Sequence, residues 1–205
     1  MNIKEFYLEN LFNGYTDKMP KWLFKEAQHE FNIIKLVIML SKLTTTQIKM
    51  LDIGCGDCRI FKNITISRFF KKRIACDIFN KKELPDKFID WLQTNRIKYQ
   101  CLPQINNMYY IPKEWGQFDI IACLGVDVHL NDEACNFLLD CAKKCLTKNG
   151  ILLWQVNRKD TIKGKWLNWV DRKLHYQYRN DQFYSPYTLK YSTNISHIYE
   201  YRQLS

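Results

Sequence analysis

The chain has 205 residues, of which 46% are hydrophobic and 15% aromatic, and its formal net charge is +10. This length and composition suit one domain with a buried core and exclude an intrinsically disordered chain. The longest apolar run is too short for a bilayer and the N-terminus lacks a secretory pattern, so we expect a cytoplasmic protein without a membrane span.

Helices and short apolar strands are predicted to alternate along the chain. Helices are expected at residues 4–13, 21–42 and 132–150, and another helix is expected to begin at residue 59. Residues 81–94 are expected to form a loop and then a helix, and residues 184–192 a short helix. Strands are expected at residues 48–54, 72–79, 97–102, 118–126, 151–157 and 196–204. This alternation predicts a parallel sheet with helices on both faces, whose ligands bind at the carboxyl ends of the strands.

Residues 51–60, LDIGCGDCRI, follow a predicted strand and combine two patterns. Cys55 and Cys58 form a Cys-x-x-Cys pair, which is typical of a zinc clip or a redox dithiol. The other close pair, Cys141 and Cys145, is expected to pack in a helix, so a four-ligand zinc site lacks its second half. The dithiol interpretation is also disfavoured, because no Trp precedes the first cysteine and no Pro separates the two. We therefore expect no metal site.

The glycine pattern gives the favoured interpretation. Gly54 and Gly56 allow a sharp turn and a close approach of the backbone to a ligand, beside the free N–H groups of a helix start. Arg59 stands where a dinucleotide fingerprint needs a third glycine. With Asp52 before the turn, the pattern instead resembles motif I of class I S-adenosylmethionine-dependent methyltransferases, with Cys58 in place of the last glycine.

The resemblance extends over residues 45–157. It implies that Asp77, at the end of the second strand, accepts hydrogen bonds from the ribose hydroxyls of the cofactor, with Ile78 and Phe79 beside the adenine. The implied cofactor is S-adenosyl-L-methionine, with S-adenosyl-L-homocysteine as product. The implied cofactor-binding residues are Asp52, Gly54, Cys55, Gly56, Asp57, Asp77, Ile78, Gln104, Leu124 and Gly125. Among them Gln104 is included because the Asp expected after the third strand is absent and Gln104 is the nearest polar residue that could bond the adenine amine.

The same resemblance implies the fold class: an α/β, Rossmann-like, doubly wound and mostly parallel seven-stranded sheet with helices on both faces and an N-terminal helical lid. Residues 1–205 are then one domain. Within it we expect a helical cap at 1–45, a cofactor-binding core at 46–157, and an acceptor-side flap with the last strands at 158–205.

An acceptor hydroxyl benefits from a base that removes its proton. His129, just after the fourth strand, is the first candidate for that base, and a purely structural role for it is about as plausible. Asp127 is a second candidate, and Tyr15 in the lid segment can contact the cofactor or the acceptor. Between residues 166 and 187, aromatic residues alternate with cations, which suits a sugar, a nucleotide or a phosphorylated substrate, or alternatively a plain covering flap.

The sequence thus predicts a methyltransferase for a small-molecule acceptor, with an oxygen as the methylated atom. The excess of positive charge leaves an anionic partner open, including an RNA substrate. Scattered, solvated lysines explain the same charge without any partner. A non-catalytic methyltransferase-like binding subunit is the third alternative.

Overall fold

The computed structural model describes residues 48–63, 70–158, 160–163, 165, 183, 187–193 and 196–203, together with 25 and 32. Apart from residues 25 and 32, the predicted N-terminal helical cap with Tyr15 lies outside the described residues, as do residues 166–182. No helix in the described residues is long and apolar enough to cross a membrane.

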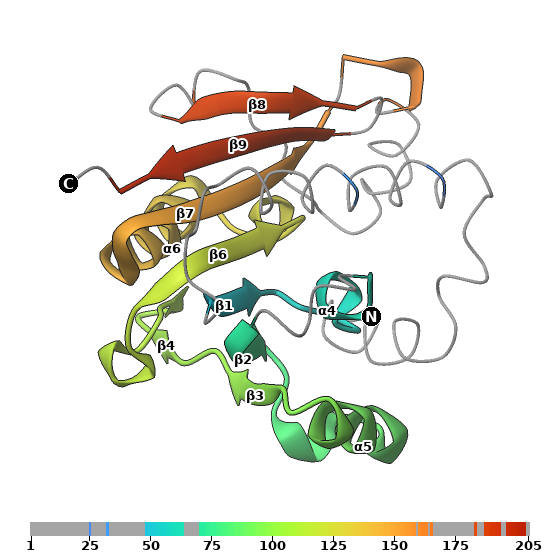
Figure 1. The fold of residues 1–205 in the computed structure, drawn as a ribbon. Coiled ribbons are helices and arrows are strands. Elements are labelled where there is room, and N and C mark those ends of the chain that lie inside the picture. Colours follow the sequence, from blue (N-terminus) through green and yellow to red (C-terminus); the bar gives the residue numbers. More distant parts are fainter. Residues whose placement is uncertain are drawn as a thin grey trace.

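A seven-stranded sheet with the order β3-β2-β1-β6-β7-β9-β8 forms the centre of the molecule (Figure 1). Its strands are β1 Ile48–Ile53, β2 Phe70–Asp77, β3 Lys98–Cys101, β6 Phe118–Leu124, β7 Leu146–Asn157, β8 Thr188–Ser192 and β9 Ser196–Arg202. The first five are parallel, whereas β9 is antiparallel to both β7 and β8. The mostly parallel, seven-stranded sheet predicted above is confirmed.

Helices cover both faces of this sheet, as predicted. The helical elements after β1 are α4 Arg59–Asn63, η2 Lys81–Glu83, α5 Asp86–Thr94, η3 Lys113–Trp115, η4 Asp127–His129 and α6 Asp132–Lys144. Phe61 of α4 and Phe88 of α5 belong to the core cluster on one face, and Leu138 and Leu139 of α6 to the cluster on the other. Between β3 and β6 the chain forms a small hairpin of β4 Gln104–Ile105 and β5 Met108–Tyr109.

The helix predicted at 132–150 is too long. It ends at Lys144 because the chain joins the sheet from Leu146, which pairs with Phe118. Cys141, expected to pack in this helix, is only half-buried, as is Phe137. The fully packed positions are Ala134, Cys135, Leu138, Leu139 and Ala142.

The short helix predicted at 184–192 is wrong as well. Residues 188–192 form the edge strand β8, in which Leu189 pairs with Tyr199 of β9. Pairing with a neighbouring strand overrides the local pattern here, because the backbone groups of β9 need partners on that side.

Candidate functional site

A cavity of about 320 Å³ opens at the carboxyl ends of β1, β2 and β6. The strand order reverses between β1 and β6, and such reversals place ligands at this edge of an open α/β sheet. Ten residues predicted from the sequence line the cavity: Asp52, Gly54, Cys55, Asp57, Asp77, Ile78, Phe79, Leu124, Gly125 and His129.

The turn after β1 is built from backbone conformations that favour glycine. Gly54 and Gly56 have φ values of 65° and 51°. A Cβ on Gly54 would lie 2.2 Å from Cγ2 of Val126, so no side chain fits there without movement. Cys58, in the place of the last glycine of the motif, also has a positive φ of 60°, and its side chain is fully buried. Its thiol therefore packs in the core beneath α4.

Asp77 at the end of β2 is held by the backbone of this turn. The Gly56 N–H donates to Oδ2 at 2.8 Å and the Ile78 N–H donates to Oδ1 at 2.7 Å. Burial raises the pKa of the Asp77 carboxyl, and these two hydrogen bonds act in the opposite direction. Each oxygen keeps accepting capacity toward the cavity. Gly56 does not line the cavity, but it fixes the carboxylate that does.

Asp52 differs from Asp77 in its partners. Only 2% of the residue is exposed, and within the described residues its Oδ2 atom has no hydrogen-bond partner. Burial, together with the charges of Asp77 and Asp57, raises the pKa of Asp52 well above its usual range. A buried carboxylate without a donor is costly, and a cationic group in the cavity would relieve that cost.

Asp57 lies at the start of α4 and is already engaged. It accepts from Arg59 Nε at 3.0 Å and from Lys62 Nζ at 3.3 Å. Arg59 also lines the cavity, so this side of the opening carries one negative and one positive side chain.

The hydrophobic side of the cavity is formed by Ile78, Phe79 and Leu102. The Phe79 carbonyl accepts from the Tyr99 hydroxyl at 3.1 Å, which fixes the chain after β2. Gln104, the candidate partner for an adenine amine, does not line the cavity. It lies exposed in β4, because residues 102–117 fold as a hairpin that turns it to solvent.

His129 in η4 lines the cavity next to the end of β6. The residue is exposed, yet protein atoms around its ring lower its pKa to about 4 through loss of water. The imidazole is therefore neutral at pH 7. Asp127 precedes it in η4, is only 1% exposed and does not line the cavity.

Sequence reasoning missed several lining residues. Tyr109 comes from the hairpin, Leu138 from α6 and Gln155 from β7. Gln155 had a usable signal, because it stands at the carboxyl end of a predicted parallel strand. The other two come from segments whose place beside the cavity depends on the tertiary fold.

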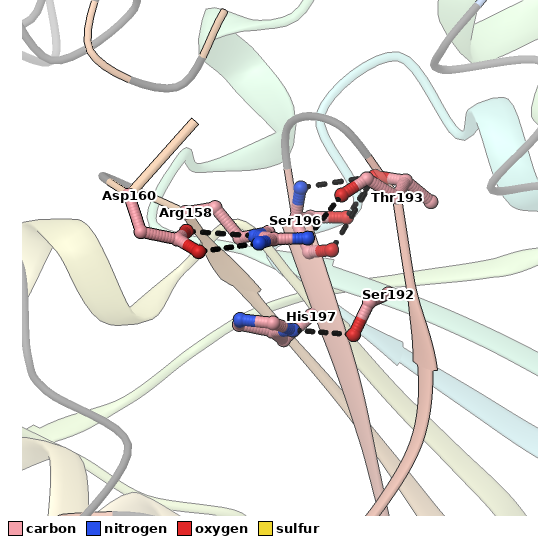
Figure 2. Close-up of polar contacts among 6 residues, drawn as sticks. All are labelled: Arg158, Asp160, Ser192, Thr193, Ser196 and His197. Atoms are coloured by element: carbon pink, nitrogen blue, oxygen red, sulfur yellow. Dashed lines mark hydrogen bonds and ion pairs between the residues drawn. The ribbon is translucent and has the colours of Figure 1, made fainter. Parts of the chain in front are cut away.

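A polar cluster closes the same edge of the sheet beyond β7, as Figure 2 shows. Arg158 makes a two-pronged ion pair with Asp160 and donates from Nη1 to the Thr193 carbonyl at 2.9 Å. The side-chain hydrogen bonds from Arg158 lower the pKa of Asp160 to about 2. Beside this pair, Ser192 Oγ and His197 Nδ1 are 2.8 Å apart. The cluster ties the turn between β8 and β9 to the end of β7.

The described residues hold no group of three His, Cys, Asp or Glu side chains that could bind a metal. All eight cysteines are free. Cys55 and Cys58 are buried, and burial is the largest cause that raises the pKa of the Cys55 thiol.

No protein-family model matches the sequence, and a search of curated proteins finds no significant match. Solved structures do match. The magnesium protoporphyrin IX methyltransferase of Synechocystis PCC 6803, solved with bound SAH, is 12% identical, with a TM-score of 0.66 over 98% of this chain and 99% of that one. The N-methyltransferase NodS of Bradyrhizobium japonicum WM9, also solved with SAH, is 14% identical, with a TM-score of 0.65 over both whole chains. The pyocyanin biosynthetic protein PhzM is 10% identical, with a TM-score of 0.61 over 82% of this chain and 53% of that one. At these identities the likeness concerns the fold.

Proposed function

The chain has the fold of the class I S-adenosylmethionine-dependent methyltransferases, and from this premise we propose that it transfers a methyl group from S-adenosyl-L-methionine to a small-molecule acceptor. The observation that supports this most is the pair of buried carboxylates, Asp52 and Asp77, on either side of the Gly54–Gly56 turn and facing one cavity. Solved structures of the same fold include methyltransferases crystallised with SAH, which favours this cofactor.

The cavity residues fit the parts of this cofactor. Asp52, which needs a cationic partner, would accept from the ammonium of the methionine part. Asp77, which is held by two backbone N–H groups, would accept from the ribose hydroxyls. Ile78 and Phe79 offer the apolar surface that an adenine ring needs. When bound, the cofactor supplies an electrophilic methyl group on a sulfonium.

The remaining work of the protein is to align the acceptor, exclude water and remove a proton. His129 is neutral at pH 7 and lines the cavity, so its ring can receive the proton of an acceptor hydroxyl. The methylated atom is therefore proposed to be an oxygen. The polar cluster around Arg158 and His197 is proposed as part of the acceptor side, since it lies at the same edge of the sheet.

A labelling experiment tests this function. The protein is incubated with methyl-labelled S-adenosyl-L-methionine and, in separate arms, with a pool of small metabolites and with total RNA. We expect label in the metabolite arm, strongly reduced for Asp77→Asn. The matched control Asp90→Asn changes an exposed carboxylate on α5 and should transfer normally.

Label found only in RNA would identify the substrate class as RNA instead. Cofactor binding without transfer to either pool would favour a non-catalytic binding subunit.

A further inference from the structure

Six cations gather at the amino ends of β1, β2 and β3, at the edge of the sheet opposite the cavity. We call this surface the basic edge. Its residues are Lys49, Lys71, Lys72, Arg73, Arg96 and Lys98. Lys71, Arg96 and Lys98 are exposed and the other three are half-exposed.

Three of these lysines form a row across neighbouring strands. Lys49 is the Cα partner of Lys72, and Lys98 is the Cα partner of Ile74, two residues further along β2. Residues two apart in a strand share a face, so Lys49, Lys72 and Lys98 lie on the same face of the sheet. With strands about 4.8 Å apart, the row spans roughly 10 Å.

The described residues provide no acidic partner for the basic edge. None of its six side chains takes part in any ion pair of the described residues. Asp119, at the start of β6, is occupied by the Lys49 backbone N–H at 2.9 Å and the Thr147 hydroxyl at 2.8 Å. Within the described part of the chain the six side chains therefore have no ion-pair partner, although the Asp119 carboxylate lies beside the Lys49 backbone.

Repulsion between neighbouring cations contributes to the lowered pKa values of two residues of the basic edge. Burial lowers the pKa of Lys72, and Lys98 and Lys49 lower it further. The Lys72 ammonium is nevertheless fixed, because it donates to the Trp115 carbonyl at 2.6 Å and lies 5.5 Å from the centre of the Phe118 ring. Burial likewise lowers the pKa of Arg73, with Arg96 adding to the effect.

The connection from β3 to β6 leaves this surface open. Residues 102–117 are all described and contain only the β4–β5 hairpin and η3, so no α-helix of that connection covers the lysine row. The exposed large hydrophobic residues in the described part of the chain are Ile105, Ile162 and Leu189, none of which belongs to the basic edge. The surface thus offers charge without an apolar wedge, unlike a membrane-inserting site.

We propose that the basic edge binds the phosphate backbone of nucleic acid without sequence preference. A row of cations from adjacent strands complements successive phosphates of one strand, and such contacts position a protein without reading bases. The inference is independent of the cofactor proposal, because the cavity lies at the opposite end of the strands.

Fluorescence anisotropy with labelled single-stranded RNA and DNA of the same sequence, about 20 nucleotides long, tests the proposal. Contacts with three to five phosphates predict that log K falls with log[salt] with a slope of roughly −2 to −4. Lys49→Glu/Lys98→Glu, which changes two members of the row, should weaken binding by at least tenfold. The matched control Lys82→Glu/Lys87→Glu lowers the net charge from +10 by the same amount, at exposed positions outside the basic edge, and should change binding less than twofold.

Circular dichroism verifies the fold of each variant, and Lys49→Gln/Lys98→Gln replaces the glutamate pair of the row if that pair does not fold. Binding to RNA or to DNA with this pattern supports the proposal. Three results overturn it: no binding by the unmodified chain, equal weakening by both glutamate pairs, or tighter binding to phosphatidylserine vesicles than to either nucleic acid.

Discussion

At the scale of single residues, the two carboxylates of the cavity have opposite hydrogen-bond states. Asp77 accepts from two backbone N–H groups, whereas Oδ2 of Asp52 has no donor within the described residues. A carboxylate that already accepts two backbone hydrogen bonds is suited to accept from neutral hydroxyls, whereas a buried carboxylate oxygen without a donor is suited to a cation. Both residues were predicted from the resemblance to class I S-adenosylmethionine-dependent methyltransferases, which places an acid before the glycine turn and another at the end of the second strand.

Cofactor binding is expected to release a proton from Asp52. Burial raises the pKa of this carboxyl in the free protein and so favours its protonated form, while a bound ammonium favours the ionised form. Calorimetry at about pH 6 in two buffers of different ionisation enthalpy measures the number of protons released. Asp52→Asn should abolish the release, and an unchanged proton count in this variant would remove Asp52 from the ammonium site.

His129 is expected to titrate well below the ordinary pKa of a histidine. Its folded-state pKa of about 4 is lower than the ordinary value of 6.5, so it stays neutral as the pH falls through the range where a histidine with the ordinary pKa becomes charged. The unfolded chain binds that proton first, so His129 lowers the stability of the protein as the pH falls from 6.5 toward 4. NMR titration of the ring protons, assigned with His129→Gln, measures this pKa directly. A midpoint near 6.5 would show a solvated ring and contradict the lowering of this pKa by burial.

At the scale of elements, the turn between β1 and α4 is where sequence and structure agree best. Its glycines need positive φ, and glycine is the residue that adopts it at least cost, so the pattern and the geometry have the same cause. The irregular connection at 102–117 had no such signal, and Gln104, predicted as a partner of the adenine amine, does not line the cavity. Pairing in the sheet determines where the helix predicted at 132–150 ends, and it makes residues 188–192 a strand instead of part of a helix. A local sequence pattern does not indicate such pairing.

Gly54→Ala is expected to destabilise the protein more than Gly116→Ala. Both glycines have positive φ, so each alanine adds a backbone cost of roughly 1–2 kcal/mol. Only at Gly54 does the new methyl group also meet a neighbour, Val126 Cγ2 at 2.2 Å, whereas at Gly116 the nearest atom is 3.9 Å away. Overpacking of this kind adds about 1 kcal/mol or more to the loss of unfolding free energy. Urea unfolding of both variants measures the difference, and equal losses would mean that the turn adapts easily.

At the scale of the whole molecule, one sheet presents two different edges. The carboxyl edge holds the cavity with its two carboxylates, and the amino edge holds the six cations of the basic edge. The alternation of strands and helices predicted this sheet, and with it the edge at which a ligand binds. The basic edge was not predicted, because its lysines are scattered along the chain and meet only through the strand order.

Equilibrium dialysis with labelled S-adenosyl-L-methionine tests the central claim most directly. We predict one bound molecule per chain, displaced by S-adenosyl-L-homocysteine. Asp77→Asn should weaken binding roughly 10- to 100-fold, because it removes a charged acceptor and sets an amide N–H against a backbone donor. Asp90→Asn should bind like the unmodified chain. No retention of label above background, or retention that Asp77→Asn leaves unchanged, would contradict the assignment of this cavity.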